Sequence, residues 1–107
     1  MSRALAAAAA ALAIAAGAFG AHAAHGPASE WLKTGSFYLL THAIVVLSLE
    51  PRHKVPARLL LGGATLFALT LYGLALGAPR WLGAVTPLGG GAMILGWVWL
   101  SWRLARA

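Results

Sequence analysis

Residues 17–27, GAFGAHAAHGP, decide whether the mature chain has three membrane helices or four. Ala21-His22-Ala23 has the small-x-small pattern of a signal-peptidase site, and it closes an alanine-rich stretch that follows Arg3. Cleavage after Ala23 would leave three helices. The same residues also fit the outer end of a first transmembrane helix that stays in the protein, which would give four.

The composition of the chain is that of a membrane protein. Of its 107 residues, 61% are hydrophobic and only 9% are charged, which is too little charge to cover the surface of a soluble domain. The 8 Lys and Arg residues against 2 Asp and Glu residues lie singly between apolar runs rather than in a basic patch, so we expect no nucleic-acid partner. Cysteine is absent, which excludes disulfides, thiolate metal sites and cysteine nucleophiles.

Four uncharged stretches divide the chain and predict its helices. A helix needs roughly 20 apolar residues to cross the ~30 Å hydrocarbon core of a bilayer, and helices satisfy the backbone of such a run internally. The second stretch is short, but Trp31 and Leu32 extend it and Lys33 can reach outward to the interface. We expect an all-α membrane protein with one domain over residues 1–107, built as a bundle of four transmembrane helices at about 4–24, 31–49, 58–77 and 81–102.

The distribution of Lys and Arg predicts the orientation of these helices. If all four span, Lys33 and Arg80 fall on one side, and the other side receives Arg3, Arg52, Lys54, Arg58, Arg103 and Arg106. Positive residues accumulate in cytoplasmic loops, so the bias places both termini and the 50–58 loop in the cytoplasm. This loop is also a candidate for binding lipid or a partner, although anchoring the orientation is enough to explain its charge.

The tryptophans fit an aromatic belt at the two membrane interfaces. Trp31 and Trp81 lie at the expected outer ends of helices, and Trp97, Trp99 and Trp102 lie toward the expected inner end of the last helix. Stacking platforms for a ligand are the less favoured interpretation of this arrangement.

Small residues recur at helical spacing and predict close helix packing. In the first helix Gly17 and Gly20 belong to stripes of small residues, which a cleaved signal peptide does not require. The stretch VTPLGGGA at 85–92 resembles the broken helices of transporters, but we favour Thr86 as an N-cap, Pro87 in the first turn and glycines packed against neighbours. The expected packing glycines are Gly17, Gly20, Gly73, Gly77, Gly89, Gly90 and Gly96.

Five segments, taken in order, resemble a known family. They are GAFGAH at 17–22, TGSFYLLTHA at 34–43, LYGLAL at 71–76, WLGAVTPLGG at 81–90 and the pair Gly96-Trp97. Their order and near spacing are similar to those of the domain-of-unknown-function 423 family, small four-helix inner-membrane proteins of bacteria. The resemblance implies a multi-pass protein of the bacterial inner membrane that retains its first helix. It implies no biochemical role, because none is established for the family.

The chain departs from the family pattern in two places. The connection between His22 and Thr34 is a few residues shorter, and FALTLY at 67–72 stands where the family has a Ser-Gly pair before Leu-Tyr. If that pair has a polar task, Thr70 is the residue left to perform it.

His42 is the candidate functional residue, because an ionisable side chain near mid-membrane is costly and is a functional hypothesis by default. At 1.5 Å per helical residue, His42 lies ~13 Å inward from Lys33, and Tyr72 lies ~12 Å inward from Arg80. We therefore expect His42 and Tyr72 to share a depth in the membrane.

Two further polar residues are expected near His42. Tyr38 precedes it by one helical turn on the same face, and Thr86 should lie near the level of Tyr38 on the fourth helix. We predict that His42, Tyr38, Tyr72 and Thr86 form one polar cluster in the outer half of the bundle. The cluster either fixes helix register by hydrogen bonding, or it exchanges a proton or binds a small solute through His42.

No motif of an enzyme is present, so we expect no catalysis, no cofactor and no metal. The two histidines of HAAH at 22–25 have metal-ligand spacing but no third ligand nearby, and a bis-histidine haem bundle is disfavoured because His22 and His42 lie at different depths. The expected role is structural, assembly or stress-related, with the lipid bilayer and a second copy or another membrane protein as partners. The alternative is a small oligomeric transporter or channel with its polar cluster around His42.

Overall fold

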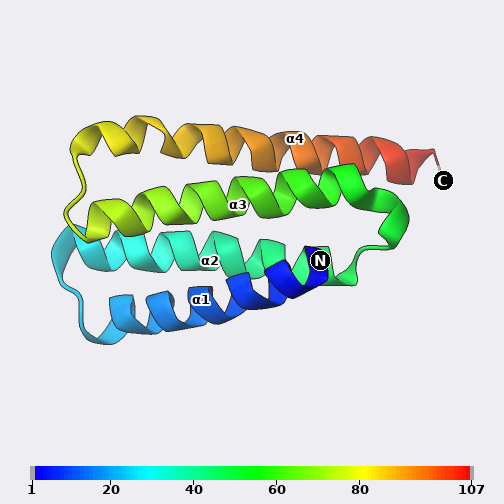
Figure 1. Ribbon diagram of the computed structural model, residues 1–107. Helices are drawn as coiled ribbons and strands as arrows, with labels where there is room; N and C mark the ends of the chain where they lie inside the picture. Colours follow the sequence, from blue (N-terminus) through cyan, green and yellow to red (C-terminus); the bar gives the residue numbers. More distant parts are fainter. Residues whose placement is uncertain (1, 107) are drawn as a thin grey trace.

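The structure, a computed structural model, describes residues 2–106 as four long helices joined by short connections (Figure 1). The helices alternate in direction, so that α1 and α3 run one way and α2 and α4 the other. The elements are α1 Ser2–His22, α2 Gly26–Ser48, the 3-10 turn η1 Pro51–His53, α3 Lys54–Ala75, the 3-10 turn η2 Arg80–Ala84 and α4 Thr86–Ala105. The predicted all-α, four-helix fold is confirmed.

Proline and glycine account for the largest differences from the expected helix boundaries. α2 begins at Gly26 rather than at 31, because Gly26 turns the chain with a φ of +62° and the following proline occupies the first turn of the helix. α3 ends at Ala75 rather than at 77, because Gly77 leaves the helix with a φ of +100°. α4 begins at Thr86 rather than at 81, because residues 80–84 form the tighter turn η2.

The remaining boundaries differ by a few residues. α1 lies slightly nearer the N-terminus than 4–24, α3 begins at Lys54 rather than at 58, and α4 continues to Ala105 rather than ending at 102. Helix ends fray, so no part of the architecture depends on these shifts.

The four helices form an open row rather than a closed ring. Each packs against its neighbour in the sequence, α1 on α2, α2 on α3 and α3 on α4, and α1 also touches α3 lightly. In the described part of the chain α1 and α4 form no packed interface, and they lie at opposite edges of the molecule in Figure 1. One side of each outer helix is therefore free of contact with the rest of the chain.

Small side chains fill much of the space between the helices. One cluster of buried residues draws on all four helices and contains Ala13, Leu32, Leu39, Ala64, Ala68, Tyr72 and Met93. A second draws on α1, α2 and α3 and contains Ala6, Ala43, Val46 and Leu60. Lipid is as apolar as leucine, so helices associate in a bilayer through close packing of this kind rather than through hydrophobic burial.

Within the described residues, three helical segments are long and apolar enough to cross a membrane: Arg3–His22, Pro51–Ala75 and Arg80–Ala105. α2 is long enough but more polar. Two of its hydroxyl groups are satisfied by its own backbone: Thr41 Oγ1 donates to the Phe37 carbonyl oxygen at 2.8 Å, and Ser48 Oγ donates to a carbonyl oxygen one turn earlier at 2.7 Å. Since α2 lies between α1 and α3 along their length in Figure 1, its polarity is compatible with crossing the bilayer beside them.

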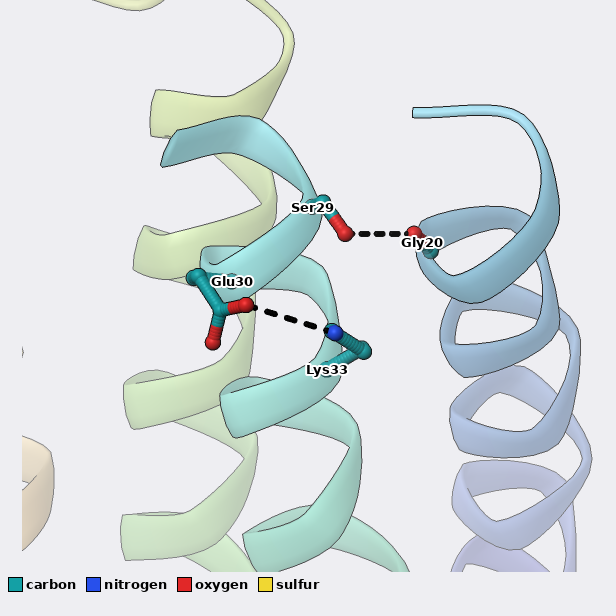
Figure 2. A network of polar contacts seen from close by, with 4 residues as sticks. All are labelled: Gly20, Ser29, Glu30 and Lys33. Atoms are coloured by element: carbon teal, nitrogen blue, oxygen red, sulfur yellow. Dashed lines mark hydrogen bonds and ion pairs between the residues drawn. The ribbon is translucent and has the colours of Figure 1, made fainter. Parts of the chain in front are cut away.

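The hairpin of α1 and α2 is closed by contacts near its turn (Figure 2). Ser29 Oγ donates a 2.7 Å hydrogen bond to the carbonyl oxygen of Gly20, which satisfies one of the free carbonyls at the end of α1. Gly20 allows the approach, since a Cβ there would lie 2.7 Å from the Cβ of Leu32. Glu30 and Lys33 form an exposed ion pair of 3.3 Å beside this contact. The signal-peptidase pattern thus lies at the turn of a packed hairpin.

Candidate functional site

Three hydrogen bonds between polar side chains link different helices. The first joins Ser36 Oγ of α2 to the Tyr72 hydroxyl of α3 at 2.7 Å, and both residues are buried. Gly35 allows the approach, since a Cβ there would lie 3.1 Å from Cε1 of the Tyr72 ring. Gly17 of α1 faces the same place, where a Cβ would lie 3.1 Å from Ser36 Cβ. This contact therefore lies where three helices meet.

The second contact joins α2 to α4 through His42, which is only 7% exposed. His42 Nδ1 lies 2.7 Å from the carbonyl oxygen of Tyr38, and His42 Nε2 lies 3.0 Å from Nε1 of Trp97. An indole N–H can only donate and a carbonyl oxygen can only accept, so the partners assign the ring proton to Nδ1 and the acceptor role to Nε2. His42 is accordingly neutral, with both ring nitrogens engaged.

The third contact lies between the last turns of α3 and the start of α4. Thr70 Oγ1 and Thr86 Oγ1 are 2.7 Å apart. Thr70 donates its proton to the Phe67 carbonyl oxygen at 2.8 Å, so Thr86 is the donor between the two hydroxyls. The expected N-cap role of Thr86 is wrong: Val85 occupies the cap position, and the Thr86 hydroxyl bonds to α3 instead of to its own helix.

The single cluster predicted for His42, Tyr38, Tyr72 and Thr86 is not the arrangement that the structure shows. His42, Tyr72 and Thr86 belong to three different contacts. Tyr38 supplies its backbone carbonyl to His42, while its ring packs edge-on against Phe67 at 5.0 Å between centroids. The polar interior is therefore a set of separate pairs.

The expectation failed because it placed Tyr72 at the wrong depth. The count started at Arg80, but Arg80 lies in η2, beyond the end of α3, so the rise per helical residue does not apply between the two. Tyr72 is instead level with Ser36, and His42 follows Ser36 by six residues of α2, ~9 Å along the helix.

Sequence reasoning overlooked Ser36 and Trp97 as hydrogen-bonding partners. Trp97 looked like part of the aromatic belt, but it lies near the middle of α4, where its indole N–H has no water to bond and needs an acceptor. The need of a membrane-embedded indole N–H for an acceptor could have predicted this pair, because the His42 ring offers an acceptor nitrogen in the interior. Thr70 was singled out only as a substitute for the family's Ser-Gly pair, and its partner Thr86 was given another role.

Four of the expected packing glycines lie at close helix–helix approaches. A Cβ at Gly89 would lie 2.7 Å from the carbonyl oxygen of Gly63, and one at Gly96 would lie 3.0 Å from Leu60 Cγ, so these two glycines bring α3 and α4 together. Gly17 and Gly20 do the same between α1 and α2. Gly63, which was not predicted, is the counterpart of Gly89 on the facing helix.

The other three glycines do not bring helices together. Gly73 faces a leucine of η2 and packs the connection between α3 and α4. Gly77 lies beyond the end of α3, where the positive φ rather than packing requires glycine. Gly90 faces open space, because a Cβ there would meet no atom of the described chain within 4 Å.

The histidines of HAAH are separated by the end of a helix. His22 is the last residue of α1 and His25 is the cap residue of α2. Within residues 2–106 no group of three or more His, Asp or Glu side chains gathers in a way that could hold a metal ion. The absence of a metal, a cofactor and catalysis stays a prediction.

Comparison with known proteins agrees with this architecture. The family model described as "Protein of unknown function (DUF423)" matches residues 16–90, from the end of α1 into α4. A UPF0382 membrane protein of Haemophilus influenzae is 35% identical, in an alignment that covers 78% of this chain and 78% of that protein. No solved structure gives a significant match. The chain is a multi-pass membrane protein, and it belongs to the DUF423 family.

Proposed function

We propose that this protein is a non-catalytic component of the bacterial inner membrane that acts through helix packing, in a structural, assembly or stress-related role. The observation that carries the proposal is the pairing of the buried polar side chains. Ser36, His42 and Thr70 are all buried, and each is hydrogen bonded to a side chain of another helix. Such bonds fix helix register, and in a bilayer they contribute about 0.6 kcal/mol each.

The spacing of the pairs supports the same proposal. Leu39 lies between Ser36 and His42 along α2 and is fully buried, so apolar packing separates the first contact from the second. Solute pathways through membrane proteins are lined by polar groups or water, and such separated pairs form no continuous lining. The engaged state of both His42 nitrogens argues in the same direction, because a proton carrier needs a nitrogen that can exchange its proton.

We also propose that both termini and the 50–58 loop face the cytoplasm. The six-to-two distribution of Lys and Arg supports this orientation, and Figure 1 has both ends of the chain and η1 at the same end of the molecule. The proposed partners are the bilayer and a second copy or another membrane protein, which would pack on the outer sides of α1 or α4. Nucleic acid is not among them.

Reconstitution into liposomes tests the proposal. We expect proton flux under an imposed pH gradient, and uptake of small solutes, to equal those of protein-free liposomes, because apolar packing separates the polar pairs described above. The His42→Gln variant should behave identically. Flux above the protein-free level that is lost in His42→Gln, and retained in a Ser48→Ala control on the same helix, whose hydroxyl donates to the Val45 carbonyl oxygen, would overturn the proposal. That result would favour the alternative, a small oligomeric transporter with its site at His42.

A further inference from the structure

Two hollows meet at Ala57 and Arg58 in the first turns of α3. The larger, about 650 Å³, is a groove between α1 and α3, which we call the α1–α3 groove. Its walls include Leu5 and Leu69, and fully buried Leu39 of α2 lines it as well. The smaller, about 380 Å³, is the basic pocket, lined by Arg3, Val46, Leu49, Glu50, Pro51, His53 and Lys54 together with the two shared residues.

The shape of the α1–α3 groove suits an acyl chain. It runs along α3 from Ala57 to Leu69, ~18 Å at 1.5 Å per residue, which is close to one leaflet of a ~30 Å hydrocarbon core. It exists because α1 packs on α2 and only lightly on α3. Gly62 helps to keep it open, since a Cβ there would meet nothing within 4 Å in the described chain. Apart from Thr65 and Arg58, its lining is apolar.

The charge of the basic pocket suits an anionic head group. Arg3, Lys54 and Arg58 contribute three positive charges, while Glu50 contributes one negative charge and is held by Arg52 at 3.1 Å. The pocket adjoins the end of the α1–α3 groove at the start of α3, so a lipid with its chain in the groove would place its phosphate here. Polybasic sites at that level attract anionic lipids by about 1 kcal/mol per Lys or Arg.

An independent observation points to a ligand in the basic pocket. His53 is only 5% exposed, and its Nδ1 is buried without a hydrogen-bond partner in the described chain. Buried polar atoms are nearly always paired, so this nitrogen needs a partner that the described chain does not supply. The first backbone N–H groups of α3 are nearby, and no side chain caps them. The N-terminus of a helix of this length is favourable for a phosphate oxygen.

We propose that the basic pocket and the α1–α3 groove together form a binding site for one anionic phospholipid. Its phosphate contacts Arg58 and the start of α3 beside His53, and one acyl chain lies in the groove. The site does not depend on the packing role proposed above, because its residues are not those of the three interior hydrogen bonds. Either proposal can fail without the other.

Native mass spectrometry of the full-length protein in detergent tests the head-group half of the site. Phosphatidylglycerol and phosphatidylcholine with identical acyl chains are titrated in parallel, and we expect one phosphatidylglycerol to bind about fivefold more tightly or better. Arg58→Gln should weaken phosphatidylglycerol binding about fivefold, while Arg80→Gln, in η2 and outside the lining of both hollows, should leave it unchanged. Equal binding of the two lipids, or equal loss in both variants, would overturn the proposal.

A second pair of variants tests the acyl-chain half. Gly62→Leu fills the groove and should abolish the preference for phosphatidylglycerol, whereas Gly91→Leu enters open space on α4 and should not. Inorganic phosphate at millimolar concentration should fail to displace the lipid. If phosphate displaces it and Gly62→Leu binds normally, the site takes an anion only and the lipid assignment is wrong. Melting of each variant in detergent without added lipid shows whether the fold is intact, and an Ala8→Leu variant, which narrows the groove from its α1 wall, replaces Gly62→Leu if the latter unfolds.

Discussion

His42 and Trp97 connect two helices that otherwise barely touch in the described part of the chain, α2 and α4. A tryptophan N–H in hydrocarbon has no water to bond, so an acceptor on a facing helix fixes the rotation of both helices. The same bond keeps His42 neutral, because the nitrogen that would take up a proton is already an acceptor. At the scale of the residue, a titratable side chain here acts as a neutral hydrogen-bonding group.

A double-mutant cycle measures this bond. His42→Leu leaves the indole N–H without an acceptor, and Trp97→Phe removes the donor, so each variant should lower the free energy of unfolding in detergent. The coupling between the two substitutions should be about 0.6 kcal/mol and not above about 1.7 kcal/mol. Far-UV circular dichroism during titration with sodium dodecyl sulfate provides the measurement. Purely additive effects would show that the bond contributes nothing to stability.

At the scale of the element, the interface of α3 and α4 depends on glycine rather than on large apolar side chains. Gly63 and Gly89 face each other across it, and a Cβ on either would lie within 3 Å of backbone atoms of the opposite helix. Backbone atoms cannot move aside as the end of a flexible side chain can. The two helices must therefore separate if either glycine acquires a side chain.

Gly89→Ala tests this dependence on glycine, with Gly91→Ala as its matched control two residues away. Gly89→Ala should lower the free energy of unfolding by about 1–3 kcal/mol, the usual range for an overpacked interface. Gly91→Ala meets open space and should be neutral or stabilising by up to about 1 kcal/mol, since alanine favours the helix over glycine. Thermal melting of both variants in the same detergent compares them. Equal behaviour would mean that α3 and α4 do not pack as closely as described.

At the scale of the whole molecule, the alternation of four helices places residues from distant parts of the sequence at the same end. Ser2 and Val55 lie at the end that holds both termini, whereas Ala28 and Ala78 lie near the hairpin turns at the other end. The open row does not alter this arrangement, because direction alternates whether or not α1 meets α4.

Cysteine labelling tests the orientation cleanly, since the native chain has no cysteine. In intact cells an impermeant maleimide should label cysteines introduced at Ala28 and Ala78 and spare those at Ser2 and Val55. After permeabilisation the cysteines at all four positions should react. Labelling of the cysteine at position 2 in a full-length chain would also show that the first helix is retained. The opposite labelling pattern would reverse the orientation, and loss of the Ser2 label would indicate cleavage near Ala23.

The number of helices and several of their close approaches could be predicted from the sequence, whereas the hydrogen-bonded polar pairs could not. Long uncharged runs predicted four helices, and small residues at helical spacing predicted that Gly17, Gly20, Gly89 and Gly96 lie at close approaches. The polar pairs could not be predicted, because they depend on the rotation of each helix and on the connections that set its depth. The count for Tyr72 failed at such a connection.

The open row of helices also has a consequence for biogenesis. Each helix packs chiefly on the one made just before it, so the contacts of the fold are local in sequence and need no late closure between the first helix and the last. During synthesis each helix that enters the bilayer therefore finds its partner already there. We expect insertion to proceed as two successive hairpins, with the basic 50–58 segment between them held back on the side of the ribosome.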